Sequence, residues 1–270
     1  MSDRLGYNKL CNVEDFRSPA LLSSIRSVYG TKTLEDPDFP KGHEHRKLWE
    51  VAMAAKTLSD LGALDEDAEI LGVGAGDEPT IFWLTTKARR VFATDLYLEP
   101  GIWADTAAPS MLTDPGRHSE GPWNPRRLVV QHMNALDLRY EDESFAGVFS
   151  SSSIEHFGQL EDVYRAAQEM CRVLRPGGIA TLSTEFRLNG PGAGLPGTLL
   201  FDAVQLHDAI IAAGDWSLVG PLDLFSSPAS RASPVIWSEA IAGIDRFPHV
   251  VLCEGEHLWT SVHLALRRGA

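Results

Sequence analysis

The sequence has few cysteines and no apolar run long enough to cross a membrane. Its 270 residues include three cysteines, Cys11, Cys171 and Cys253, and none lies in a CxxC or Cys/His pattern. They predict neither a disulfide framework nor a zinc site, and they favour a reducing compartment. The apolar runs are shorter than the roughly 18 residues of a membrane span, and the N-terminus lacks the apolar core of a signal peptide. We therefore predict a cytoplasmic protein with no membrane partner.

Basic residues are also scarce. The chain has 24 Lys and Arg against 37 Asp and Glu, which gives a formal net charge of −13. Binding to a nucleic-acid backbone or an anionic lipid surface depends on many Lys and Arg contacts with phosphate, so both are disfavoured as partners. The 44% of hydrophobic and 23% of charged residues are typical of a water-soluble globular protein. The composition leaves a homodimer open.

The chain divides into a polar N-terminal segment and a longer patterned region. Residues 1–42 are polar and rich in turn formers towards their end, and we expect an irregular arm or lid. From residue 43 to residue 64, apolar side chains recur at the spacing of an amphipathic helix. We predict that residues 43–270 form a single domain, with inserted loops at 101–127 and 225–257.

Short apolar segments alternate with helical patterns over most of residues 68–270. This alternation predicts an α/β fold with a mostly parallel sheet and helices on both faces. The connection before the last segment is rich in Ser, Pro and Gly, and the last strand is therefore expected to run antiparallel. The predicted strands are 68–73, 90–94, 127–130, 145–150, 178–183, 218–224 and 258–266.

A glycine-rich turn follows the first of these strands. Gly72, Gly74 and Gly76 alternate with Val73 and Ala75, and a helix is expected to begin just after them. Glycines at a strand-to-helix turn allow the backbone to approach a ligand closely, and the helix N-terminus supplies free N–H groups. The third glycine of a dinucleotide-binding fingerprint is missing, so the turn alone does not identify the ligand.

An aspartate ends the second predicted strand, about twenty residues after the glycines. A carboxylate here can accept two hydrogen bonds from the hydroxyls of a ribose, as in sites for NAD and for S-adenosylmethionine. Asp95, followed by Leu96, is therefore a candidate cofactor-binding residue, and an ordinary turn aspartate is the alternative.

Three further segments give the sequence a specific resemblance. Residues 133–145 (MNALDLRYEDESF), 147–157 (GVFSSSSIEHF) and 169–178 (EMCRVLRPGG) follow the glycine turn and Asp95 in order. Together these segments resemble class I S-adenosylmethionine-dependent methyltransferases of the small-molecule type, over roughly residues 68–184. The resemblance implies a Rossmann-like, seven-stranded, mostly parallel sheet with an antiparallel last strand.

The resemblance also implies S-adenosylmethionine as cofactor and assigns residues to it. Asn134 stands where the family has the Asp that reads the adenine amino group, and its carbonyl oxygen can still accept a hydrogen bond. His156, on the loop after the fourth strand, is the candidate general base for a hydroxyl acceptor; a packing or cofactor-contacting histidine is the alternative. The other expected cofactor-binding residues are Gly72, Val73, Gly74, Gly76, Asp95, Leu96, Ala135, Ser150 and Ser151.

Two positions depart from the family pattern. Ile70 stands where the family commonly has an acid that holds the methionine end of the cofactor, so Glu69, Glu78 or the backbone alone must take that role. Ala146 replaces a usual Asp. These departures keep a second hypothesis open, a cofactor-binding scaffold or sensor without transfer, and an NAD-dependent dehydrogenase is a third.

The acceptor is expected to be a small molecule. A hydroxyl of a sugar, polyketide or secondary-metabolite intermediate is our first hypothesis, and an amine or carboxylate acceptor is the alternative. The metal-ligand spacing HExxH is missing, so we predict no metal. The candidate substrate residues are His43, His45, Trp103, Glu185 and His207.

Overall fold

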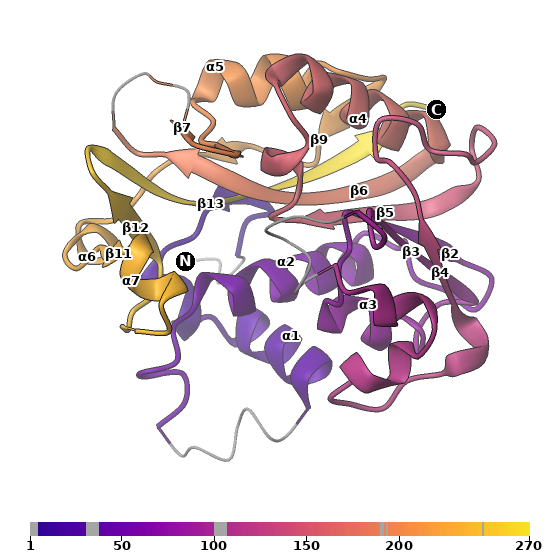
Figure 1. The fold of residues 1–270 in the computed structure, drawn as a ribbon, viewed down its shortest axis with the longest axis horizontal. Coiled ribbons are helices and arrows are strands. Elements are labelled where there is room, and N and C mark those ends of the chain that lie inside the picture. The colour runs from indigo at the N-terminus through magenta and orange to yellow at the C-terminus, as the bar shows by residue number, and fades with distance from the viewer. Residues whose placement is uncertain (1–4, 31–37, 100–106, 190–191, 193, 245) are drawn as a thin grey trace.

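The structure is a computed structural model, and it describes residues 5–30, 38–99, 107–189, 192, 194–244 and 246–270. Its centre is one twisted sheet with the strand order β10-β1-β13-β6-β5-β2-β3-β4 (Figure 1). The sheet-forming strands of this path are β1 (Asn8–Leu10), β2 (Glu69–Val73), β3 (Arg90–Asp95), β4 (Leu128–His132), β5 (Phe145–Ser151), β6 (Leu174–Arg187), β10 (Leu222–Asp223) and β13 (His257–Arg268).

The five central strands run parallel, and the last strand of the chain does not. β2 pairs in parallel with β3 and β5, β3 with β4, and β5 with β6. β13 lies antiparallel to β6, in a register that pairs Val262 with Thr184. The Rossmann-like α/β fold and the antiparallel last strand are thus confirmed. The strand count differs, because β9 (Trp216–Leu218), β11 (Val235–Ile236) and β12 (Val251–Glu254) bring the sheet to 11 strands within the described residues.

The N-terminal segment is more regular than the sequence suggests. β1 pairs antiparallel with β13, and helix α1 (Pro19–Tyr29) packs against α2 (Arg46–Asp60). The expectation of an irregular arm is therefore wrong for these residues. A three-residue strand is too short for an alternating pattern to reveal. Leu21 and Ile25 of α1 are fully buried with Trp49 and Met53 of α2, so burial against α2 fixes this segment.

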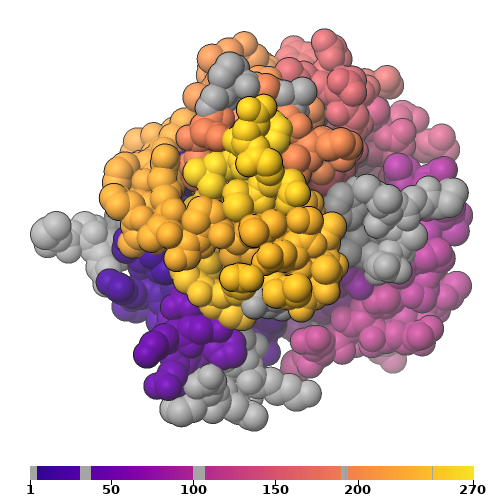
Figure 2. Space-filling view, turned by 60° about the vertical axis from the view of Figure 1, so that its left-hand side comes forward, coloured from indigo at the N-terminus to yellow at the C-terminus, as the bar shows by residue number. Residues whose placement is uncertain are grey.

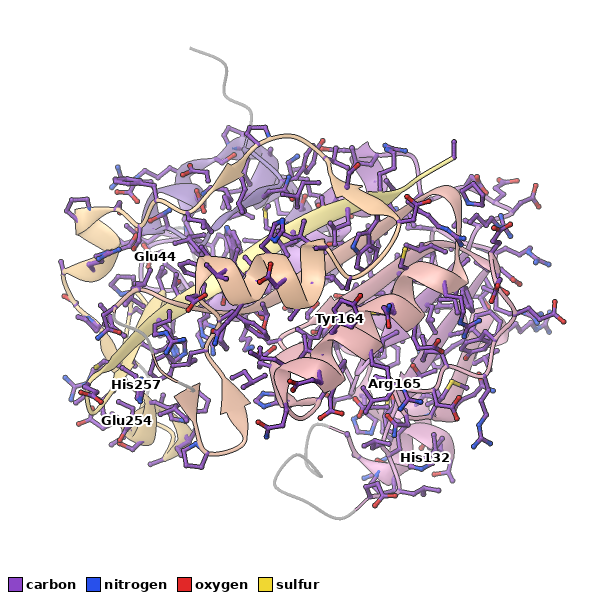
Figure 3. All side chains as sticks on the ribbon, turned by 90° about the horizontal axis from the view of Figure 1, so that it is seen from above. Glu44, His132, Tyr164, Arg165, Glu254 and His257 are labelled. Atoms are coloured by element: carbon purple, nitrogen blue, oxygen red, sulfur yellow. The ribbon has the colours of Figure 1, made fainter. Side chains whose placement is uncertain are left out.

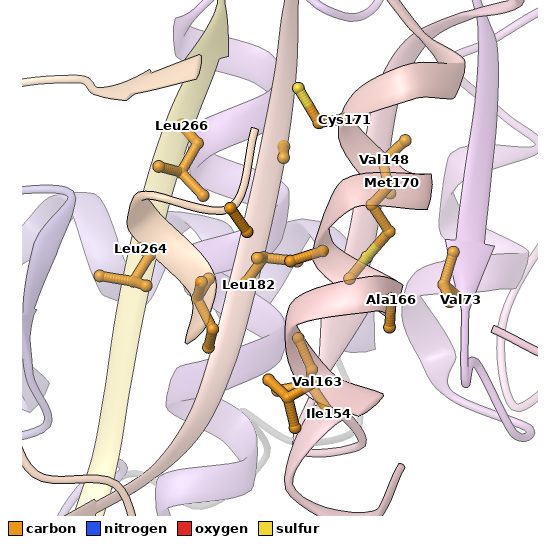
Figure 4. Packing of buried hydrophobic residues seen from close by; sticks show 14 of the residues in the cluster. Val73, Val148, Ile154, Val163, Ala166, Met170, Cys171, Leu182, Leu264 and Leu266 are labelled. Carbon is orange, nitrogen blue, oxygen red and sulfur yellow. The ribbon is translucent and has the colours of Figure 1, made fainter. Parts of the chain in front are cut away.

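Helices cover both faces of the sheet. α1, α2 and α3 (Pro79–Leu84) lie on one face, and α4 (Leu160–Val173) and α5 (Ala203–Leu206) lie on the other (Figure 1). The α4 side of the core is apolar, with Val163, Ala166 and Met170 facing Leu182 and Leu264 of the strands (Figure 4). Tyr164 and Arg165 mark the outer side of α4 in Figure 3. α2 is buried almost all round because it lies between the sheet and α1.

The two long connections contain structure of their own. Within 107–127 the chain forms short 3-10 helices, including Pro109–Leu112 and Pro115–His118. Within 225–257 it forms α6 (Pro228–Arg231), β11, α7 (Trp237–Ile241) and β12, which pairs with β13. Figure 2 shows these orange to yellow residues on one face beside the indigo N-terminal region. Among the described residues, no helix has the length and apolar character needed to span a membrane.

Candidate functional site

The glycine turn lies at the carboxyl edge of the parallel strands, between β2 and α3. Gly74 and Gly76 have φ angles of +59° and +51°, a left-handed conformation that favours glycine. A Cβ on Gly72 would lie 2.5 Å from the Phe149 ring, and one on Gly74 would lie 2.7 Å from Ser153 Cβ. Val73 is fully buried, so only its backbone can face a ligand. The turn therefore fits a ligand that contacts the main chain.

Asp95 ends β3 directly beside this turn. Gly76 N–H donates to Asp95 Oδ2 over 2.8 Å, and Leu96 N–H donates to Oδ1 over 2.7 Å. Burial raises the pKa of Asp95, and these two N–H donors oppose the shift. The carboxylate thus orders the glycine turn in addition to any ribose contact. Leu96 is 41% exposed, as expected of an apolar side chain that lies against a flat ring.

Asn134 lies at the tip of β4, next to Asp95. Met133 N–H donates to the Asp95 carbonyl over 3.0 Å, which joins the two strand tips. The Asn134 side chain is exposed, and its Oδ1 accepts from Leu136 N–H over 2.9 Å. Asn134 is therefore a turn cap as well as a candidate ligand for adenine, because a carbonyl oxygen has two lone pairs. Ala135 is buried in the core, which limits it to a packing or main-chain contact.

Glu78 is placed where the family acid would be needed, and Glu69 is not. Glu69 lies at the start of β2 and pairs with Arg89 over 2.7 Å, away from the carboxyl edge. Glu78 immediately precedes α3, hydrogen-bonds the Ser151 side chain, and has a buried Oε2 with no partner among the described residues. Burial, with the negative charge of Glu50 second, raises the pKa of Glu78 to about 8. Ser150 precedes Ser151 at the end of β5, and its hydroxyl is buried.

His156 lies on the 3-10 helix Ile154–His156 that follows β5. Its Nδ1 lies 2.9 Å from the Gly197 carbonyl, in the turn between β7 (Gly194–Leu195) and β8 (Thr198–Leu199). A carbonyl can only accept, so this contact assigns the proton to Nδ1 and the lone pair to Nε2. Burial lowers the pKa of His156, which keeps the ring neutral near pH 7.

A buried ionic network lies on the α2 side of the same edge. Arg46 Nη1 donates to Glu50 Oε1 over 3.0 Å, to Glu185 Oε1 over 2.6 Å and to Ser261 Oγ over 3.0 Å. Glu50 Oε2 accepts from Ser152 Oγ over 2.8 Å. Burial alone would raise the pKa of Glu50, but the charges of Lys47 and Arg46 lower it to about 2. Glu185, a candidate substrate residue, is 4% exposed and paired with Arg46.

The two histidines before α2 lie at the outer end of this network. His45 caps α2 by accepting from Lys47 N–H over 3.0 Å, and its ring centroid is 4.1 Å from that of His249. Burial, then the neighbouring His249, lowers the pKa of His45 to about 3. The ring of His43 lies between Phe39 and Phe247. Both positions match a helix-capping and packing role.

Two other candidates do not join the site. His207 lies on the π-helix His207–Ile211, which packs with α4 and β9, and its side chain is 62% exposed beside Asp208. Trp103 lies outside the described residues. The 107–127 connection contacts the residue that follows the glycine turn, because His118 Nδ1 lies 2.9 Å from Asp77 Oδ2. Within the connection, His118 Nε2 lies 2.9 Å from Ser110 Oγ.

Sequence reasoning missed Arg46 and Glu50. Their spacing of four residues is that of an ion pair on one helix face, but a surface pair has the same spacing. Only the tertiary position of α2 shows that these charges are buried. Among the described residues, no group of three or more His, Cys, Asp or Glu side chains is arranged to hold a metal ion.

Comparison with known proteins agrees with this geometry. Residues 71–182 match the methyltransferase domain family. Erythromycin 3''-O-methyltransferase of Saccharopolyspora erythraea is 29% identical over 130 residues, which are 47% of this chain and 38% of that protein. The aligned part is thus about two fifths of the relative's length.

Solved structures share the fold across most of the chain. Geranyl diphosphate C-methyltransferase of Streptomyces coelicolor, in complex with S-adenosylhomocysteine, has a TM-score of 0.54 and 16% identity, and the match covers 93% of this chain and 98% of that one. The 1,6-didemethyltoxoflavin-N1-methyltransferase of Burkholderia thailandensis, also with S-adenosylhomocysteine, has a TM-score of 0.51 and 20% identity, with 92% and 89% covered. The glycine turn and Asp95 both lie within the part of the chain that matches the methyltransferase domain family, and the solved structures share its fold.

Proposed function

We propose that this protein is an S-adenosylmethionine-dependent methyltransferase that transfers a methyl group to a hydroxyl oxygen of a small molecule, with His156 as the general base. The observation that carries the proposal is the contact between His156 Nδ1 and the Gly197 carbonyl, 2.9 Å apart. It leaves the lone pair on Nε2, on a loop that directly follows Ser151 at the cofactor edge. The distant likeness to an O-methyltransferase supports the same acceptor atom.

Each residue of the site has a separate role in this proposal. S-adenosylmethionine supplies an electrophilic methyl group on a sulfonium. Asp95 would accept hydrogen bonds from the ribose hydroxyls, and Asn134 would face the adenine. The N–H groups of the Gly72–Gly76 turn would contact the methionine part of the cofactor. His156 Nε2 takes the hydroxyl proton while the acceptor oxygen becomes a methyl ether, so that no alkoxide has to form in advance.

Glu78 is our assignment for the ammonium of the methionine end. Its Oε2 is buried without a partner among the described residues, and it follows the glycine turn by two residues. An ammonium group would supply both a hydrogen-bond donor and the positive charge that a buried carboxylate needs. This assignment explains how the chain can tolerate Ile70 in place of the family acid.

The test measures binding and transfer separately. Calorimetry should show binding of S-adenosylhomocysteine and none of NADH, and methyl-labelled S-adenosylmethionine should label the small-molecule extract of the source organism. His156→Gln should lower kcat by about 10²–10⁴-fold and leave the Kd for S-adenosylhomocysteine unchanged. If that variant keeps most of its activity, or if binding and turnover fall together, His156 is not the base.

A further inference from the structure

The buried network beside His156 contains more carboxyl groups than cations. Arg46 Nη1 pairs with Glu50 Oε1 and Glu185 Oε1, and Lys47 Nζ donates to Glu50 Oε2 over 3.1 Å, while Glu185 Oε2 is buried without a hydrogen bond from the described residues. The carboxyls of Glu78 and Glu155 remain without a cationic partner among the described residues. The groups at this edge of the sheet are Arg46, Lys47, Glu50, Glu78, Glu155 and Glu185.

Glu155 is the second of these carboxyls, and it is buried more completely than Glu78. Its residue exposure is 1%, and Oε2 accepts from Thr184 Oγ1 over 2.8 Å. Oε1 is buried with no hydrogen bond from the described residues, and it lies 4.0 Å from His156 Nε2. Burial, with the charge of Glu185 second, raises the pKa of Glu155 to about 8. The protein therefore holds an unsatisfied carboxyl next to the candidate base.

Burying a carboxyl without a hydrogen-bond or charge partner lowers the stability of the fold. If the protein did not use this carboxyl, its replacement by an apolar group would be nearly neutral for stability. A ligand that brings a protonated amine would supply the missing donor and the missing positive charge together. A neutral hydroxyl would supply only the donor. The net charge of −13 also favours the approach of a cation.

We propose that the methyl acceptor is itself a cation, a hydroxylated small molecule whose protonated amine pairs with Glu155 while its hydroxyl faces His156. The proposal rests on the proposed function and names the substrate class for it. Glu185 contributes through its charge and stays paired with Arg46. The amine is a recognition group here, and the hydroxyl remains the methylated group.

The β7–β8 hairpin lies against the 3-10 helix that carries Glu155 and His156. Oε1 of Glu155 is covered in this state, and β8 contacts the 3-10 helix that carries Glu155 and His156. The Gly197 carbonyl of the same hairpin touches His156. We therefore expect the hairpin to shift when an acceptor binds at these side chains.

The first experiment separates the extract of the source organism by charge before the reaction. A cation-exchange resin at pH 7 divides the small molecules into retained and unretained fractions, and each is incubated with the protein and methyl-labelled S-adenosylmethionine. We expect label in the retained fraction. Label in the unretained fraction alone overturns the cationic acceptor and leaves the methyltransferase proposal intact. Label in neither fraction counts against the proposed function itself, and against this inference with it.

The second experiment tests Glu155 directly. Glu155→Gln keeps the shape of the protonated carboxyl, so the fold should persist, and removes the charge that the amine needs. With the acceptor purified from the labelled fraction, we expect KM to rise at least tenfold and kcat to change less than threefold. Glu161→Gln, an exposed position on α4, is the matched control and should change neither value.

A competing explanation assigns Glu155 to the sulfonium of the cofactor. Calorimetry distinguishes the two, because S-adenosylmethionine carries that charge and S-adenosylhomocysteine does not. We expect Glu155→Gln to leave both dissociation constants within twofold of the wild-type values. A selective loss of affinity for S-adenosylmethionine, or an unchanged acceptor KM, would overturn the proposal.

Discussion

The two halves of the site are built in different ways. The cofactor half consists mainly of backbone at strand tips, where Gly72–Gly76, Asp95 and Met133 are joined by short hydrogen bonds. The acceptor half consists of side chains from distant segments, where Arg46 meets Glu185 and Ser261. A local turn can be ordered by its own residues, whereas a buried ion pair depends on the whole fold. We therefore expect substitutions that break the Arg46 ion pairs to lower the free energy of unfolding most, and substitutions in the cofactor half to act mainly on binding.

The largest effect is expected from breaking the buried pair. Glu185→Ala should lower the free energy of unfolding by about 3–5 kcal/mol, because it removes one partner of a pair in which both side chains are at most 5% exposed. Urea denaturation measures the change. Glu69→Ala, which breaks the more exposed pair with Arg89, is the matched control and should cost about 1 kcal/mol or less. Equal losses in the two variants would contradict the difference between the halves.

Asp95→Ala should mainly affect binding. We expect the Kd for S-adenosylhomocysteine to rise by about 10- to 150-fold, or roughly 1.5–3 kcal/mol, through loss of a charged hydrogen-bond acceptor. Part of this loss comes from the glycine turn, because Gly76 N–H loses its acceptor too. Calorimetry gives the Kd and thermal unfolding gives the stability. An unchanged Kd would remove Asp95 from the ribose site.

Glu78 should make both binding and stability depend on pH. Its pKa of about 8 lies above the usual range, so the folded state binds the proton more tightly than the unfolded state does. The contribution to stability is full at low pH and is lost as pH rises from about 4.5 to about 8. Pairing with an ammonium would ionise Glu78, so binding of S-adenosylhomocysteine at pH 7 should release about one proton.

The variant Glu78→Gln tests whether the proton released on binding comes from Glu78. Calorimetry in buffers of different ionisation enthalpy should show that the proton release is lost and that the Kd for S-adenosylhomocysteine rises about tenfold. Methylthioadenosine lacks the amino-acid end of the cofactor, so its Kd should not change. If both ligands lose affinity equally, Glu78 does not read the ammonium.

The smallest effect is expected from Asn134. Because its Oδ1 accepts from Leu136 N–H, Asn134→Leu should lower the free energy of unfolding by about 1 kcal/mol without any cofactor. Asn134→Asp keeps the acceptor and should retain this stability. If the Asp variant loses as much stability as the Leu variant, the hydrogen bond from Leu136 N–H is not the stabilising contact of Asn134.

The cofactor half of the site is easier to predict from the sequence than the acceptor half, because its residues lie in short continuous segments. Gly72–Gly76, Asp95 and Asn134 each belong to a short segment whose function follows from its local pattern. Glu185 and Arg46 are 139 positions apart, and no local pattern shows that they meet. The ambiguity between Glu69 and Glu78 was likewise decided by position, since only Glu78 lies at the carboxyl edge. The paired strand β1 was missed because three residues carry no periodicity.

The pairing of β1 with β13 has a consequence for biosynthesis. Lys9 is aligned with His263, and Asn8 Oδ1 accepts from Ala265 N–H over 2.7 Å, so the first strand of the chain is held by the last. Such a long-range contact cannot form on a ribosome until the final strand has emerged. β1 therefore stays unpaired with β13 until the residues of β13 have been synthesised, whereas α1 can pack on α2 much earlier. A protein that lacks β13 would therefore also leave β1 without this partner.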